Sequence, residues 1–175
     1  MGQHKALIEV EGDSAVRTVT RRLVEGGCAS VVCVSPIHAP PEIRDLASVY
    51  DPGEGPVGAV LAALESSVSE WSFVIAVDHY GFESCDVGRL LESARSDTTR
   101  SDVSLATDGS RVQPLIAVWR TETCREKLRI AFDSGMRSFD GVLASMTANS
   151  VVFRPRSLLN INTPTDLLGF RQGLR

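Results

Sequence analysis

The chain has 175 residues, of which 43% are hydrophobic and 23% are charged, as expected for one globular domain over 1–175. A formal net charge of -4 argues against the basic surface of nucleic-acid-binding proteins. No apolar run approaches the length of about 18 residues that a membrane span needs. Because Cys28, Cys33, Cys85 and Cys124 form no C-x-x-C pair, we expect reduced thiols and a cytoplasmic location.

Short apolar runs alternate along the chain with segments of helical periodicity, which is typical of a mainly parallel sheet covered by helices. The expected strands are at 30–35, 48–51, 73–77, 103–106, 115–119 and 151–153. The expected helices are one capped by Asp13 or Ser14, one from Pro56 to Val68, one capped by Asp86, one capped by Thr121, and a final one opened by Thr163-Pro164.

Asp78 follows the most hydrophobic of these strands, FVIAV at 73–77. In open α/β sheets, ligands bind beyond the carboxyl ends of the strands. A carboxylate at that position can hold Mg²⁺, which takes one or two carboxylates together with waters and substrate phosphates. The alternative interpretation is an aspartate that only begins a turn. No histidine pair has metal-ligand spacing, and no serine–histidine–acid arrangement supports a hydrolase.

The loop from Asp51 to Gly55 leads directly into a helix that begins with Pro56. Glycines let the backbone approach a ligand, and the amides at a helix N-terminus can meet acceptors such as a guanine oxygen. Asp51 can accept hydrogen bonds from the ring and amino nitrogens of a base. The same Gly-Pro sequence is also ordinary turn chemistry before a helix, so both interpretations stay open.

Four further polar positions are candidates for ligand contact. Asn160 and Asn162 are not needed to cap the helix that follows them, because Thr163 can do so, and their amides remain available for a ligand or a metal. Arg137 can clamp a phosphate. Lys5 and Arg137 can equally be solvated surface residues.

Together these segments resemble the molybdenum cofactor guanylyltransferases, within the MobA-like nucleotidyltransferase family. The resemblance runs in order over nearly the whole chain, and its most specific part is LNINTP at 159–164, which reproduces the family's L-N-I-N-T-P segment. The other matching segments are MGQHKAL at 1–7 (R-M-G-x-x-K-A-L), GPVGA at 55–59 (G-P-L-A-G), Asp78 (C-D-x-P), QPL at 113–115 and GMRS at 135–138 (G-x-R-S). The resemblance implies a three-layer, Rossmann-like nucleotidyltransferase fold.

The resemblance also implies a reaction, in which GMP passes from GTP to the terminal phosphate of a molybdopterin-type acceptor and pyrophosphate leaves. Asp78 would carry Mg²⁺, Lys5 would meet phosphate, and the Asp51–Gly55 loop with Pro56 would read guanine. Asn160, Asn162 and Arg137 would face the pterin or assist the metal. GTP and the pterin are thus the expected small-molecule partners, with maturation factors of molybdenum enzymes as a further expectation.

Two departures from the family pattern affect this interpretation. The family's first strand and its L-A-G-G-x-S-x-R loop are absent, so the sheet should lack its first central strand and the chain should be catalytically impaired. The segment after Asp78 reads His79-Tyr80-Gly81 and lacks the family's proline.

The absent strand has two explanations. Either an internal methionine has been taken as the start of a protein about 15 to 20 residues longer, or the chain is a truncated, degenerate relative. The alternative functions are a non-catalytic binding protein of this fold, and a transferase with another nucleotide or acceptor, such as cytidylyl transfer to molybdopterin or transfer to a sugar phosphate or phospholactate.

Overall fold

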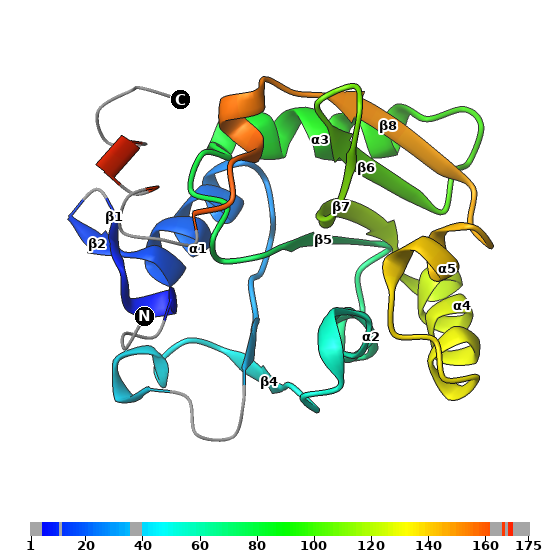
Figure 1. Ribbon diagram of the computed structural model, residues 1–175, viewed down its shortest axis with the longest axis horizontal. Coiled ribbons are helices and arrows are strands. Elements are labelled where there is room, and N and C mark those ends of the chain that lie inside the picture. The colour runs from blue at the N-terminus through cyan, green and yellow to red at the C-terminus, as the bar shows by residue number, and fades with distance from the viewer. Residues whose placement is uncertain (1–4, 11, 36–39, 162–165, 167, 170–175) are drawn as a thin grey trace.

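The computed structural model describes residues 5–10, 12–35, 40–161, 166 and 168–169 (Figure 1). The helices are α1 (Ala15–Glu25), α2 (Gly55–Ser66), α3 (Ser84–Ser96), α4 (Thr121–Asp133) and α5 (Phe139–Leu143), with 3-10 turns η1 (Lys5–Leu7), η2 (Pro41–Ile43) and η3 (Pro155–Leu158). The strands are β1 (Glu9–Val10), β2 (Asp13–Ser14), β3 (Cys33–Ser35), β4 (Ser48–Tyr50), β5 (Trp71–Ile75), β6 (Val103–Thr107), β7 (Val112–Arg120) and β8 (Ala148–Val152). Within the described ranges, no helix combines the length and the apolarity that crossing a membrane requires.

The strands form a short β1–β2 ladder, a parallel β3–β4 pair and a sheet in the order β5-β7-β6-β8. In this last sheet β6 and β8 are parallel, whereas β7 is antiparallel to both β5 and β6. The antiparallel orientation follows from the turn between β6 and β7, because only antiparallel neighbours can be joined by so short a connection. Asp108 closes that turn by accepting the amides of Ser110 and Arg111, each at 2.8 Å. The α/β class is confirmed, with a mixed four-stranded sheet.

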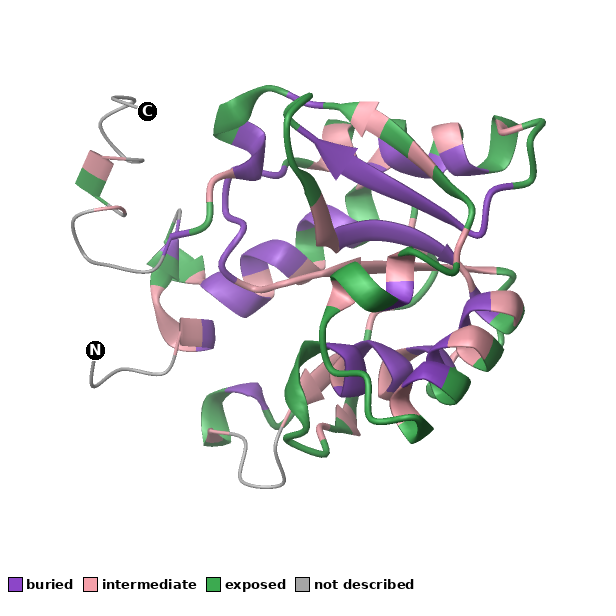
Figure 2. Ribbon diagram, turned by 45° about the vertical axis from the view of Figure 1, so that its right-hand side comes forward, coloured by how far each residue is buried: buried purple, intermediate pink, exposed green. Residues whose placement is uncertain are grey.

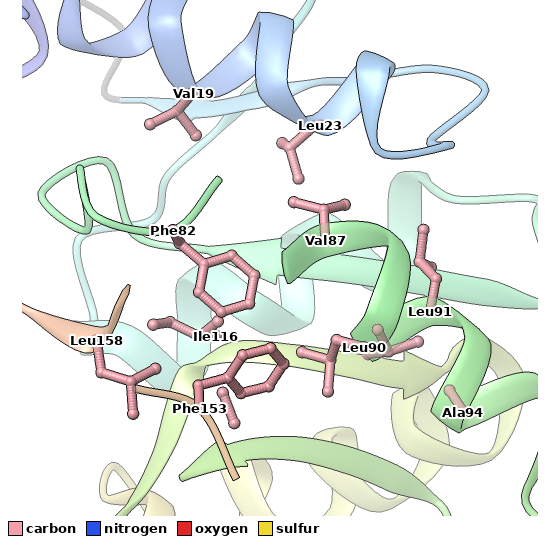
Figure 3. Close-up of a cluster of buried hydrophobic side chains, with 12 residues drawn as sticks. Val19, Leu23, Phe82, Val87, Leu90, Leu91, Ala94, Ile116, Phe153 and Leu158 are labelled. Carbon is pink, nitrogen blue, oxygen red and sulfur yellow. The ribbon is translucent and has the colours of Figure 1, made fainter. Parts of the chain in front are cut away.

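Helices cover both faces of the sheet, which gives the three layers expected (Figure 2). Alternate residues of β7 point to opposite sides: Ile116 and Val118 join one core cluster, and Ala117 and Trp119 join the other. The first cluster contains residues of α1 and α3 (Figure 3), and the second contains residues of α2 and α4. Each strand residue of β6 is buried, as befits a strand covered on both faces.

Among the described strands, β3 and β5 do not pair with each other. Among the described residues, β3 pairs with β4 alone and β5 pairs with β7 alone. A groove of about 740 Å³ separates the two edges and is lined by both strands together with α1 and α2. As a result every residue of β5 is only half-buried, in contrast to β6.

The observed element boundaries correct several expectations. Thr121 is the first residue of α4 and not its cap, and its hydroxyl instead shares a hydrogen bond with that of Ser72 at 2.9 Å. Asp86 is the third residue of α3, where it completes a reciprocal capping box with Glu83. Val68 lies beyond the end of α2 and is fully exposed, because the chain turns away after Ser66.

The ends of the strands also differ from the expected ones. The expected strand at 30–35 reduces to β3, and the one at 73–77 is displaced to β5. The final helix opened by Thr163-Pro164 lies outside the described residues.

Candidate active site

Asp78 lies three residues beyond β5, at the carboxyl end of that strand, and it is only 8% exposed. Its Oδ2 accepts a hydrogen bond from the Lys5 Nζ at 3.1 Å, so an ammonium from η1 and this carboxylate form an ion pair. Its Oδ1 is buried and has no hydrogen-bond partner in the described part of the chain. Because a buried carboxylate oxygen is costly to leave unpaired, this atom marks a position where a cation or a donor can bind.

The two residues after Asp78 are also buried and respond to its charge. Burial lowers the pKa of His79, against the opposing effect of the negative charge on Asp78. The His79 Nδ1 is a second buried atom without a partner among the described residues. Burial, and then the charge of Asp78, raise the pKa of Tyr80 to about 12, and its hydroxyl donates to the Lys5 carbonyl oxygen at 3.4 Å. The phenol is therefore a neutral hydrogen-bond donor at physiological pH.

The loop that carries Asp78 is fixed by α1. Arg22 is only 6% exposed, and its guanidinium donates to the carbonyl oxygens of Tyr80 and Phe82. These bonds satisfy two backbone acceptors of a loop that no sheet supports. The Phe82 side chain is inserted into the core cluster between α1 and α3, where it contacts Phe153 with ring centroids 5.0 Å apart (Figure 3).

The same loop packs tightly against η3. At Gly81, a Cβ atom would lie only 2.0 Å from the carbonyl oxygen of Arg156, so any side chain there would displace backbone. Beyond η3, the Ile161 amide donates to the Asp78 carbonyl oxygen at 3.0 Å. This bond brings the exposed Asn160 next to the Asp78 loop. The other expected asparagine, Asn162, lies outside the described residues.

The Asp51–Gly55 loop forms a second group of candidate residues. Asp51 continues from β4 and folds the loop on itself, since its Oδ1 accepts the Gly53 amide at 2.9 Å. Gly55 has a φ of 85°, a conformation that favours glycine. Pro56 occupies the first turn of α2, where its missing amide costs nothing.

Arg137 belongs to this second group. Its Nη2 donates to Glu54 Oε2 at 2.8 Å, its Nη1 donates to the Phe132 carbonyl oxygen at 2.7 Å, and its guanidinium stacks on the Phe132 ring. The arginine thus ties the end of α4 to the Asp51–Gly55 loop. In this arrangement its charge is already paired with a carboxylate.

The structure therefore assembles the expected residues into two groups. Lys5, Asp78 and Asn160 come together at the end of β5, and Asp51, Gly55, Pro56 and Arg137 come together at the start of α2. The groove between β3 and β5 borders both, because its lining includes Ala6 and Val77 beside the first group and Pro56 beside the second.

Sequence reasoning missed Arg22 and Gly81, which hold the Asp78 loop in place. A signal for Arg22 was present, since it lies three residues after Val19 and therefore on the apolar face of α1. A charged residue at such a position is buried only when its charge or its donors find partners. No local signal marked Gly81, because its close neighbour is 75 residues away in the chain.

The residues present fit a magnesium ion bound through a single carboxylate. Within the described ranges, no cluster of three or more histidine, cysteine, aspartate or glutamate side chains forms an all-protein cage. Mg²⁺ does not require one, because it keeps several waters and shares substrate phosphates. The unpartnered Oδ1 of Asp78 is the oxygen that such an ion needs.

The polar groups gather beyond the carboxyl ends of strands, where open α/β sheets bind their ligands, so the fold and the site define a ligand-binding α/β protein. Comparison with known proteins specifies the class further: residues 1–147 match the MobA-like NTP transferase domain. The chain belongs to this family of nucleotidyltransferases.

Relatives by sequence are named as guanylyltransferases. The chain is 28% identical, over 178 aligned positions, to a probable molybdenum cofactor guanylyltransferase of Opitutus terrae. The alignment covers 95% of this chain and 86% of the relative. It is 25% identical to a molybdenum cofactor guanylyltransferase of Photobacterium profundum, over 99% of this chain and 89% of the relative.

Solved structures share the fold at lower identity. Molybdopterin-guanine dinucleotide biosynthesis protein A of Archaeoglobus fulgidus superposes with a TM-score of 0.78 at 19% identity, over 99% of this chain and 91% of that one. A 2-C-methyl-D-erythritol 4-phosphate cytidylyltransferase of Thermus thermophilus superposes with a TM-score of 0.74 at 20% identity, over 98% and 94%. Because a molybdopterin-guanine dinucleotide biosynthesis protein and a cytidylyltransferase superpose almost equally well, the fold by itself does not select the base.

Proposed function

We propose that this protein transfers GMP from GTP to a molybdopterin-type acceptor in a Mg²⁺-dependent reaction. The observation that carries the proposal is the Asp78 carboxylate at the end of β5, with one oxygen paired to Lys5 and the other buried and unpartnered. The named sequence relatives favour guanine and the pterin acceptor over cytosine and a sugar phosphate.

In the proposed reaction, a phosphate oxygen of the acceptor forms a bond to the α-phosphorus of GTP. The bond from that phosphorus to the bridging oxygen breaks, and pyrophosphate leaves with the electron pair. The attacking phosphate is already ionised at neutral pH, so the site needs no strong general base. The chain's task is to hold the reacting groups in line and to neutralise their charge.

Individual residues have separate tasks in this proposal. The Asp78 Oδ1 holds Mg²⁺, which when bound neutralises phosphate charge. Lys5, whose side chain is 42% exposed, presents its ammonium to the phosphates from the neighbouring position. Asp51 and the amides at the start of α2 read the guanine edge, and Asn160 faces the acceptor. Arg22 and Gly81 act only by positioning the Asp78 loop.

The proposal also includes slow transfer by this chain. Among the described residues, β5, which leads to Asp78, pairs with β7 alone, and a groove lies beside it. An edge that is not held by a second strand fluctuates more, and displacement of a catalytic group by about 1 Å can reduce a rate by about 10²-fold.

The test is a titration of GTP, CTP and ATP with Mg²⁺ by calorimetry, followed by pyrophosphate release in the presence of molybdopterin. We expect GTP to bind best, and chelation of Mg²⁺ to abolish release. Asp78→Asn should reduce release about 10²–10³-fold, the effect typical of removing one electrostatic contact to a transition state. Lys5→Met should reduce release as well.

A matched control is Asp45→Asn, which removes a carboxylate that is also ion-paired, to Arg17 at 2.7 Å, but on the exposed surface. This variant should bind GTP and release pyrophosphate like the unchanged chain. Full activity of Asp78→Asn would show that this aspartate does not hold the metal. Absence of binding by all three nucleotides would favour a non-catalytic protein of this fold.

A further inference from the structure

Tyr80 has no task of its own in the proposed reaction, although it lies two residues after Asp78 and is only 1% exposed. Its ring belongs to a buried cluster that three separate parts of the chain complete: Val10, Ala15 and Ile161. A ring that is enclosed in this way has little freedom to move. Its hydroxyl group therefore has a fixed position in the molecule.

The hydroxyl group of Tyr80 contacts the backbone of Lys5. It donates to the Lys5 carbonyl oxygen at 3.4 Å, while the Lys5 Nζ donates to Asp78 Oδ2 at 3.1 Å. The loop after β5 thus binds the same lysine at two points, through its backbone and through its ammonium group. Both contacts join η1 to this loop across more than seventy positions of the sequence.

The ion pair and η1 itself contribute little to fixing the lysine. The Lys5 side chain is 42% exposed, and exposed ion pairs are weak because water screens them and a long side chain loses rotamer freedom. η1 is a single 3-10 turn, closed by a long hydrogen bond from the Ile8 amide to the Lys5 carbonyl oxygen at 3.3 Å. Ala6 is buried, but burial of an apolar group is not directional. A fixed donor to the Lys5 backbone supplies the direction that these contacts lack.

We propose that Tyr80 is a positioning residue for Lys5, whose hydroxyl group holds the Lys5 backbone so that the ammonium group stands beside Asp78, where the phosphates of the nucleotide bind. This inference rests on the proposed function, in which Lys5 meets those phosphates. The tyrosine stands where the family's C-D-x-P pattern has proline. Because the proline side chain has no donor, the family pattern does not supply this contact.

Acylation of lysines tests the contact without any nucleotide. The unchanged chain, Tyr80→Phe and Thr18→Val would be treated with an N-hydroxysuccinimide ester of acetic acid, and the modification of each lysine followed by mass spectrometry. Tyr80→Phe keeps the buried ring and removes the donor, so the ion pair that shields Lys5 loosens. Acylation of Lys5 should then be about 2- to 10-fold faster, the scale of losing one ordinary hydrogen bond. Lys127, which pairs with Asp102 at 2.7 Å, is the internal reference and should react at an unchanged rate.

Thr18→Val is the matched control. Thr18 is buried, and its hydroxyl group donates to the Val10 carbonyl oxygen at 3.1 Å and not to Lys5. Val10 belongs to the same cluster as the Tyr80 ring. Both variants lose one hydrogen bond from a hydroxyl group to a carbonyl oxygen, so their losses of stability in urea should be similar. Only Tyr80→Phe should change the acylation of Lys5.

Binding of GTP with Mg²⁺ and of guanosine, which lacks phosphates, connects the contact with the phosphate chain. In calorimetry, Lys5→Met should weaken GTP binding about 10-fold or more, as for the loss of a charged hydrogen-bond donor, and leave guanosine binding unchanged. Tyr80→Phe should weaken GTP binding about 2- to 10-fold. In the Lys5→Met background it should add no further loss, because both changes act through the same ammonium group.

Two acylation results would overturn the inference. One is an equal rate for Lys5 in the unchanged chain and in Tyr80→Phe, and the other is an equal acceleration in Tyr80→Phe and Thr18→Val, which would show a general loosening. If Lys5→Met weakens GTP binding and Tyr80→Phe does not, the proposed function stands and the positioning role falls. If Tyr80→Phe speeds acylation but neither variant weakens GTP binding, the positioning contact stands and the phosphate role of Lys5 in the proposed function falls.

Discussion

Gly81 lies where the loop after β5 passes over the carbonyl oxygen of Arg156 in η3. Its backbone does not need the left-handed region, so its role is to permit close packing. Since the loop carries Asp78 and η3 leads to Asn160, this contact connects two parts of the candidate site. A residue without a side chain thus determines whether they meet.

Gly81→Ala should therefore destabilise the protein. The new Cβ would lie 2.0 Å from a backbone oxygen that cannot rotate away, and overpacking of this kind costs about 1–3 kcal/mol. Urea unfolding measures the loss. The control is Gly88→Ala in α3, where a Cβ would lie 3.5 Å from the nearest atom outside its helix, the carbonyl oxygen of Gly26. That variant should be unchanged or more stable by about 0.5–1 kcal/mol, and equal losses in the two would contradict this account.

Asp102 is the buried carboxylate that holds the start of β6. Its Oδ2 accepts from Lys127 Nζ at 2.7 Å, from the Thr147 amide at 2.8 Å and from the Thr147 hydroxyl at 2.9 Å. Burial alone would raise its pKa, but these hydrogen bonds outweigh burial, so the pKa of Asp102 lies below its ordinary value. The ionised form is therefore the one that stabilises the fold.

The stabilisation by Asp102 should depend on pH with a definite sign. It is fully present above the unfolded-state pKa of about 3.9 and is lost as the pH falls through the lower folded-state value. Asp102→Ala should cost about 1–3 kcal/mol at neutral pH, because it leaves buried donors unpaired. The difference from the unchanged chain should shrink in acid. Urea unfolding at a series of pH values tests this, with the exposed Glu126→Ala as the control; a difference independent of pH would refute the linkage.

At the scale of elements, α1 does more than cover the sheet. Its apolar face carries Val19 and Leu23 into the core, and Arg22 on the same face donates to the loop that follows β5. The helix lines the groove, and the Arg22 bonds link it directly to the loop that carries Asp78. Loop geometry and helix position are coupled through one side chain.

Arg22→Met tests this link, because methionine keeps most of the apolar stem and removes the donors. Leaving the carbonyl oxygens of Tyr80 and Phe82 buried without a donor should cost at least about 1–3 kcal/mol and speed hydrogen exchange in the Asp78 loop. The matched control is Arg21→Met, at the neighbouring position, whose ion pair to Glu25 is 3.9 Å long and exposed. Its effect on stability should be small. If the two variants behave alike, the loop is held by other contacts.

Element boundaries show why sequence alone was right about kinds of structure and wrong about their ends. Periodicity gave α2, α3 and α4, because their buried positions repeat at helical spacing. It did not give the start of α4, because Thr121 found a partner in Ser72 across the structure and not in its own first turn. It displaced the strand toward the C-terminus, because residues 76–77 are as apolar as β5, which spans Trp71–Ile75. It missed α5, because the five residues of Phe139–Leu143 are too few to show helical periodicity.

At the scale of the whole molecule, two clusters of buried hydrophobic residues lie on opposite faces of the sheet. Cys124 lies in the core that α2 and α4 form, where it is 0% exposed and where burial, together with the charge of Asp102, raises its pKa to about 12. Cys85 lies on the surface. Modification of Cys85 therefore reports on the accessible surface, and modification of Cys124 reports on opening of the core.

We expect iodoacetamide to modify Cys85 readily in the folded protein, and Cys124 only through global unfolding. For a domain of ordinary stability, that difference is about 10³-fold or more. A time course followed by mass spectrometry measures both rates, and in urea the two cysteines should react alike. Similar rates under native conditions would show that the second core opens locally.

The sequence by itself determined the layered α/β class, the order of the main elements, the position of Asp78 after an apolar strand and the likeness to one family of nucleotidyltransferases. These features are local, because periodicity, caps and short motifs are formed by residues that are close together in the sequence. Only the tertiary structure decided that Lys5 pairs with Asp78, that Arg137 pairs with Glu54, and that Gly81 must lack a side chain. Each of these contacts joins residues more than seventy positions apart, and no local pattern records which distant backbone will arrive beside a given side chain.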